Sequence, residues 1–184
     1  LCDRKKMIYE PREDSYLLKE EVIKFSSGKN VLDMGSGSGI QAEAAIDAGV
    51  KSLLVVDIDS MAVKKLADRG IKAIESDLFS NVKGKFDLII FNPPYLPEDK
   101  REDKESRRIT SGGKKGDEII IRFLKDVNKH LNKNGIILIV VSSLTPKRKI
   151  LKILKDKKLN KEILSEKKLF MEKLEVWKIE TIRE

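Results

Sequence analysis

The 184-residue sequence predicts an α/β protein with a doubly wound, mostly parallel sheet that ends in an antiparallel hairpin. Three observations predict this fold: short apolar runs, helical patterns that alternate with them, and two final strand-like runs with no helix between them. We expect residues 1–184 to form a single domain, because the length suits one core and 40% of the residues are hydrophobic.

Four apolar runs rich in Val, Leu and Ile are expected to be parallel strands buried on both faces: residues 30–34, 52–58, 85–91 and 135–141. Helical periodicity is found at residues 14–25, 40–48, 60–69, 117–131 and 146–158. Residues 161–170 and 174–182 are expected to pair as a hairpin through a turn at residues 171–173. We also expect an edge strand around residues 71–75.

The composition disfavours several classes of protein. No apolar run approaches the ~20 residues of a bilayer-spanning helix, and the first ten residues lack a signal-peptide core. Cys2 is the only cysteine, so a disulfide framework is excluded, and His130 is the only histidine. A His/Cys zinc site and a Ser–His–Asp triad are therefore disfavoured. We expect a cytoplasmic protein with no membrane segment and no metal site of its own.

The net charge of +8 is concentrated near the C-terminus, where residues 145–184 hold 13 Lys or Arg against 7 Asp or Glu. Two interpretations are open. The basic side chains can form a solvated helix face, or they can attract an anionic partner such as RNA.

The first group of candidate functional residues is the glycine-rich turn at residues 33–39, between a predicted strand and a predicted helix. Gly35, Gly37 and Gly39 would let the backbone turn sharply and approach a ligand. Asp57 ends the next strand, 22 residues after Gly35, where its carboxylate can accept hydrogen bonds from both hydroxyls of a ribose. We expect a nucleoside cofactor here.

The residues around this turn narrow the choice of nucleoside. The chain has no lysine-bearing P-loop, which disfavours hydrolysis of a nucleoside triphosphate. Asp33 precedes the glycines, where its carboxylate would repel a pyrophosphate and attract a cation. S-adenosyl-L-methionine carries an ammonium, a sulfonium and a ribose and has no phosphate. The pattern therefore predicts this cofactor and methyl transfer.

The second group is the run Asn92, Pro93, Pro94 and Tyr95, at the carboxyl end of a predicted strand. Consecutive prolines can simply terminate a strand. At this sheet edge, however, the Asn92 side-chain oxygen and a backbone carbonyl held by the prolines can accept both hydrogens of a planar –NH2 group. Tyr95 can stack against that group.

Such a grip suits methylation of an amide or exocyclic amine, whose nitrogen is a poor nucleophile because its lone pair is delocalised. Orientation toward the sulfonium methyl and stabilisation of the charge that develops on nitrogen can both lower the barrier. The methylated nitrogen loses its proton readily, so a dedicated histidine base is not required.

These motifs resemble the class I S-adenosylmethionine-dependent methyltransferases that act on planar nitrogens. Residues 9–15, Tyr-Glu-Pro-Arg-Glu-Asp-Ser, further resemble the opening signature of the HemK-related protein glutamine methyltransferases, in their archaeal and eukaryotic branch. The resemblance extends over about residues 7–182. It implies a Rossmann-like, seven-stranded sheet and methylation of the glutamine in the Gly-Gly-Gln motif of a translation release factor.

The resemblance also implies roles for individual residues. Ser15 would contact the methionine part of the cofactor, Asp77 would meet the adenine amino group, and Asn92 would bind both the cofactor and the substrate amide. The remaining cofactor residues would be Asp33, Gly35, Gly37, Gly39 and Asp57. Catalysis would depend on Asn92, Pro93 and Tyr95, and the substrate would contact Asn92, Pro94, Tyr95, Gly112 and Gly113, within a substrate-side loop at about residues 92–116.

Relatives in this branch imply a small zinc-binding activator subunit, which we expect to add a strand to the edge at residues 71–75. Two alternatives are open. The enzyme can methylate an exocyclic amine of DNA or RNA, adenine N6 or guanine N2, or the chain can be a non-catalytic binding module with a methyltransferase-like fold.

Overall fold

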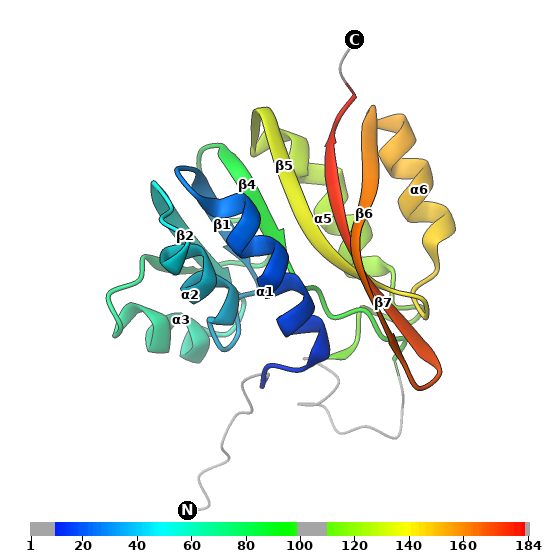
Figure 1. Ribbon diagram of the computed structural model, residues 1–184, viewed down its shortest axis with the longest axis horizontal. Helices are drawn as coiled ribbons and strands as arrows, with labels where there is room; N and C mark the ends of the chain where they lie inside the picture. Colours follow the sequence, from blue (N-terminus) through cyan, green and yellow to red (C-terminus); the bar gives the residue numbers. More distant parts are fainter. Residues whose placement is uncertain (1–9, 99–109, 183–184) are drawn as a thin grey trace, which may run out of the picture.

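The structure is a computed structural model that describes residues 10–98 and 110–182 (Figure 1). Seven strands of these residues form one sheet: β1 (Asn30–Met34), β2 (Ser52–Asp57), β3 (Ala73–Glu75), β4 (Phe86–Phe91), β5 (Leu131–Ser142), β6 (Leu159–Leu169) and β7 (Glu172–Thr181). The helices of the described part are α1 (Glu13–Ser26), α2 (Ile40–Asp47), α3 (Ser60–Ala67), α5 (Glu118–Asp126), the 3-10 helix η1 (Val127–Lys129) and α6 (Lys147–Asp156).

The strand order in the sheet is β3-β2-β1-β4-β5-β7-β6. The pairs from β3 through to β5 are parallel, whereas β7 runs antiparallel to both of its neighbours, β5 and β6. The chain builds the sheet outward from β1 to β3, then returns to β4 and builds in the opposite direction. This topology confirms the predicted doubly wound, mostly parallel sheet of seven strands with a C-terminal antiparallel hairpin.

Helices cover both faces of the sheet (Figure 1). Val31 and Leu88 pack in a core with α1 and α2, whereas their neighbours Leu32 and Ile89 pack in a second core with α5 and α6. Successive side chains point to opposite faces of a strand, so a strand covered on both faces needs apolar residues throughout. In the described part of the chain, no helix is long and apolar enough to cross a membrane.

Some boundaries differ from the prediction. The expected helix at residues 117–131 ends in η1, and β5 begins at Leu131 because this residue pairs with Phe86 before a register shift. The hairpin turns at Phe170 and Met171, not at residues 171–173, because Glu172 already pairs with Leu169. The expected edge strand is confirmed as β3, which lies at one end of the strand order and is only three residues long.

Candidate active site

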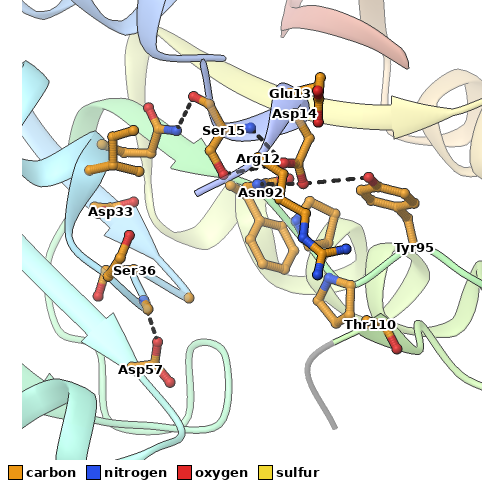
Figure 2. Close-up of a pocket in the computed structure, with 18 of the residues that line it drawn as sticks. Arg12, Glu13, Asp14, Ser15, Asp33, Ser36, Asp57, Asn92, Tyr95 and Thr110 are labelled. Carbon is orange, nitrogen blue, oxygen red and sulfur yellow. Dashed lines mark hydrogen bonds between the residues drawn. The ribbon is translucent and has the colours of Figure 1, made fainter. Parts of the chain in front are cut away.

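A cavity of about 410 Å³ lies at the carboxyl ends of β1, β2 and β4, beside the start of α1 (Figure 2). The order in which the chain adds strands to the sheet reverses between the parallel neighbours β1 and β4, and doubly wound sheets bind ligands at this point. Predicted site residues from four separate segments line the cavity: Ser15, Asp33, Gly35, Gly37, Asp57, Asn92, Pro93, Pro94 and Tyr95.

The glycine-rich turn after β1 is held against the end of β2. The Gly37 N–H donates to Asp57 Oδ2 at 2.8 Å, and Asp57 Oδ1 accepts from the Asp59 N–H at 2.8 Å. Gly39, with a φ of 90°, precedes α2, and a Cβ there would lie 2.5 Å from Leu66 Cδ2. Gly39 therefore lets the turn approach α3 closely, and it is not among the residues that line the cavity.

The surroundings of the Asp33 carboxylate suit the binding of a cation. Its side chain is 1% exposed, and its Oδ2 has no hydrogen-bond partner. Burial, and secondarily the carboxylate of Asp57, raise the pKa of Asp33 from 3.8 to about 7. Gln41 Oε1, from the first turn of α2, is also buried without a partner in the same cavity wall. Because buried acceptors are seldom left unsatisfied, a cationic donor fits this end of the cavity.

A second cavity of about 240 Å³ adjoins the first and shares part of its wall, including Gly35 and Asp57. Asp77 lines this second cavity and not the first, and its Oδ2 accepts a hydrogen bond from Arg122 Nη2 of α5 at 2.7 Å. An ammonium at Asp33, a ribose at Asp57 and an adenine toward Asp77 would lie in the order in which S-adenosylmethionine carries them. The residues present therefore fit this cofactor.

Asp14 connects α1 to the Asn-Pro-Pro-Tyr run (Figure 2). Asn92 Nδ2 donates to Asp14 Oδ2 at 3.1 Å, and the Tyr95 hydroxyl donates to the same oxygen at 3.4 Å. Asp14 Oδ1 accepts from the N–H and the hydroxyl of Ser15 at 2.7 and 3.2 Å. Because Asn92 Nδ2 is engaged by Asp14, the acceptor Oδ1 is the atom left buried without a partner at the cavity. Asp14 thus orients Asn92 to accept a hydrogen bond.

Replacement of Asp14 by asparagine tests this orienting role. The amide side chain would offer one acceptor oxygen where the carboxylate offers two, so either the Ser15 N–H or Asn92 Nδ2 loses its partner. We expect kcat to fall by about 10- to 100-fold, in the range of a lost positioning contact, while the enzyme stays folded. The exposed Glu20→Gln on the same helix is the control. An unchanged kcat for Asp14→Asn would show that Asn92 holds its orientation without this carboxylate.

The predicted substrate residues Gly112 and Gly113 are not among the residues that line the cavity. The Gly112 N–H donates to the Leu96 carbonyl at 2.9 Å, and the Glu98 N–H donates to the Gly113 carbonyl at 3.0 Å. A Cβ on Gly112 would come within 2.6 Å of the Pro94 carbonyl oxygen, so glycine lets the two backbones touch. Residues 99–109 of the predicted substrate-side loop lie outside the described residues.

Sequence reasoning missed three site residues: Asp14, Gln41 and Arg122. Each has an ordinary helical explanation, because Asp14 and Gln41 lie in first turns and Arg122 is a half-exposed helix residue. Asp14 did stand inside the opening signature at residues 9–15, which was the one available signal. Part of that signature, including Tyr9, lies outside the described residues.

The fold and the site together define a class I methyltransferase. Residues 14–171 match the family model described as Methyltransferase small domain. A Methanocaldococcus jannaschii protein that carries the provisional name protein N5-glutamine methyltransferase is 41% identical over 177 residues, which cover 92% of this chain and 89% of that protein. The chain belongs to the methyltransferase small domain family, in the group that includes the protein N5-glutamine methyltransferases.

Other relatives agree with this assignment. A release factor glutamine methyltransferase of Borreliella burgdorferi is 32% identical over 70% of this chain, and the match spans 51% of that protein. A solved chain of the E. cuniculi Mtq2–Trm112 complex, described as responsible for methylation of the eRF1 translation termination factor, aligns with a TM-score of 0.77. It is 26% identical, and the alignment covers 95% of this chain and 98% of that chain. The predicted resemblance, enzyme class and S-adenosylmethionine dependence are confirmed.

Proposed function

We propose that this enzyme methylates the side-chain amide nitrogen of the glutamine in the Gly-Gly-Gln motif of a translation release factor. One observation carries the proposal: Asn92 donates through Nδ2 to Asp14 and keeps Oδ1 buried and unpartnered at the cavity. A buried acceptor at the end of β4 matches an N–H of a primary amide. The relatives named for glutamine methylation support the same chemistry.

The residues of the site divide the work between binding and positioning. Asp33 and Gln41 would hold the ammonium of the cofactor, Asp57 its ribose and Asp77 its adenine. The bound cofactor supplies an electrophilic methyl group on a sulfonium. Asn92 Oδ1 would accept one N–H of the substrate amide, and the Pro93 carbonyl would accept the other. Both acceptors stabilise the positive charge that develops on nitrogen, and the methylated nitrogen then releases one of its protons to water.

A second candidate substrate is an exocyclic amine of DNA or RNA, because the same two acceptors fit any planar –NH2 group. The charges around the cavity argue against a polyanion. Among its lining residues Arg12 is basic, whereas six are acidic: Glu13, Asp14, Asp33, Asp57, Asp59 and Glu172. The C-terminal basic segment is also partly neutralised, since Lys147, Lys152 and Lys173 form ion pairs within the protein. These observations favour a protein substrate.

Methyl transfer from labelled S-adenosylmethionine into an unmethylated extract, followed by protease or nuclease, separates the two candidates. We expect the label to disappear with protease and to reside in a band of release-factor size. If nuclease alone removed the label, the substrate would be a nucleic acid and the proposed protein substrate would be wrong.

We further propose that a small zinc-binding subunit adds a strand to β3, as a partner of the cytoplasmic enzyme. β3 pairs with β2 on one side only, and the half-buried Ile71 and Ile74 lie in this segment. The Lys72 carbonyl and the Ser76 N–H face β2, accepting from Val55 and donating to Asp57, so the backbone groups of Ala73 and Glu75 face away from the sheet. The solved neighbour is itself a complex with a second protein.

Ala73→Pro tests the added strand, because proline removes an outward N–H and spares the contacts with β2. We expect the wild-type enzyme to form a heterodimer with the candidate subunit in size-exclusion chromatography, and the variant to lose at least ~10-fold in affinity for it. Thermal unfolding of the isolated enzyme should change little, which serves as the control. If the variant bound the subunit as tightly as the wild type, strand addition at β3 would be wrong.

A further inference from the structure

The turn between β6 and β7 carries Phe170 and Met171, whose side chains are 93% and 83% exposed. No other large apolar side chain of the described residues is exposed by more than 54%. The residues on either side of the turn, Leu169 and Glu172, line the active-site cavity. In Figure 1 the hairpin end lies at the same end of the sheet as the start of α1. The exposed pair therefore borders the mouth of the active site.

The geometry of the turn does not explain this choice of residues. Leu169 pairs with Glu172, so the loop has only two residues, and Met171 has a φ of 60° in the left-handed region. Glycine or asparagine is favoured at such a position, because a larger side chain is sterically strained there. Two apolar side chains that are exposed to water bury no surface within the enzyme, so they do not stabilise its fold. The pair thus has the character of a contact surface and not of a turn-forming sequence.

We propose that Phe170 and Met171 form a docking site for the polypeptide substrate, next to the glutamine that enters the cavity; this inference rests on the proposed function. A Gly-Gly-Gln motif offers a single side chain to the cavity, so affinity for the whole protein must come from contacts outside it. An aromatic ring and a flexible thioether gain free energy when a protein surface covers them. They would do so within a few residues of Glu172 and Leu174 in the cavity wall.

The charges nearby fit a polypeptide better than a nucleic acid. Lys173, beside the turn, is paired with Glu166 and Glu175 at 2.8 Å each, and Glu172 accepts a hydrogen bond from the Ser142 hydroxyl at 2.6 Å. The acidic cavity wall described above would repel phosphates that approached together with a stacked base. We therefore expect the turn to contact an uncharged or basic surface of the protein substrate.

The double substitution Phe170→Ser and Met171→Asn tests the docking site, since asparagine suits the left-handed position and preserves the turn. With intact release factor we expect KM to rise at least ~10-fold, an effect the size of a lost interface anchor, while kcat stays within about twofold. With a Gly-Gly-Gln tripeptide, which lacks the flanking protein surface that would cover the turn, kcat/KM should be equal for both proteins. Ile23→Ser, which removes an exposed apolar residue near the far end of α1, is the matched control and should leave KM unchanged.

Three results would overturn the docking site. The first is an unchanged KM of the double variant for intact release factor. The second is a loss of kcat/KM with the peptide as large as the loss with the intact protein. The third is a change in the mass of the free enzyme, measured by sedimentation, in the double variant. The second result would mean that the turn shapes the cavity, and the third that it joins two copies of the chain. Failure of the proposed function is distinct, because the wild-type enzyme would then transfer no methyl group to release factor.

Discussion

Asn92→Ala is expected to lower kcat by about 100- to 1,000-fold, the range found when one preorganised polar group at the reacting atom is removed. Affinity for S-adenosylmethionine should stay within a few-fold of wild type, because Asp33, Asp57 and Asp77 are untouched. Turnover falls because the substitution removes Asn92 Oδ1, the buried and unpartnered acceptor that would bind an N–H of the substrate amide. Turnover by labelled methyl transfer and cofactor binding by calorimetry measure the two effects separately.

Asn132→Ala is a matched control for this experiment. Asn132 is also half-buried and also donates through Nδ2 to an aspartate, Asp87, at 2.7 Å, but it lies at the opposite end of the sheet. Turnover should change little in this variant. If Asn92→Ala kept more than a tenth of the wild-type kcat, the grip on the amide nitrogen would be wrong.

Asp33→Asn is expected to weaken S-adenosylmethionine binding by about 10- to 100-fold, because the ammonium loses a charged hydrogen-bond partner. The pKa of Asp33, raised to about 7 by burial and by Asp57, makes the wild-type affinity depend on pH. Only the carboxylate attracts the ammonium, so affinity should rise from pH 5.5 to 7.0, whereas the variant should show little slope. Calorimetry over this range, in which an α-amino group with a pKa of about 7.7–8.0 stays mostly protonated, measures both.

The same pKa shift predicts how the stability of the enzyme without cofactor depends on pH. A folded-state pKa above the ordinary value means that the folded state binds the proton more tightly than the unfolded state. Stability from this group is therefore present below about pH 4 and is lost as the pH rises toward 7. At pH 8 Asp33→Asn should be more stable than wild type by on the order of a few kcal/mol, and Asp47→Asn, at an exposed position, should match wild type. A wild-type affinity for S-adenosylmethionine that did not vary with pH would contradict the assignment of Asp33 as the residue that binds the cofactor ammonium.

The layered fold was predictable because its strands are covered on both faces. Val31 with Leu32, and Leu88 with Ile89, must all be apolar, so each strand reads as a continuous run. Boundaries were less predictable where pairing decides them. The start of β5 depends on Leu131 meeting Phe86, and the hairpin turn depends on Leu169 meeting Glu172.

The site was predictable where motif and strand end coincide, as at Asp33, Asp57 and Asn92. It was not predictable where two distant segments meet. Asp14 and Asn92 are 78 residues apart, and Asp77 and Arg122 are 45 apart. Only the packing of α1 and α5 against the sheet brings each pair into contact, and nothing in the local sequence of either member signals the other.

The most direct test of the central claim uses purified enzyme, S-adenosylmethionine and an unmethylated release factor, with mass spectrometry to locate the product. We predict one methyl group on the side-chain nitrogen of the Gly-Gly-Gln glutamine, and none on a release factor in which that glutamine is replaced by glutamate. Methylation of the glutamate variant to the same extent, or of a residue other than the motif glutamine, would contradict the account.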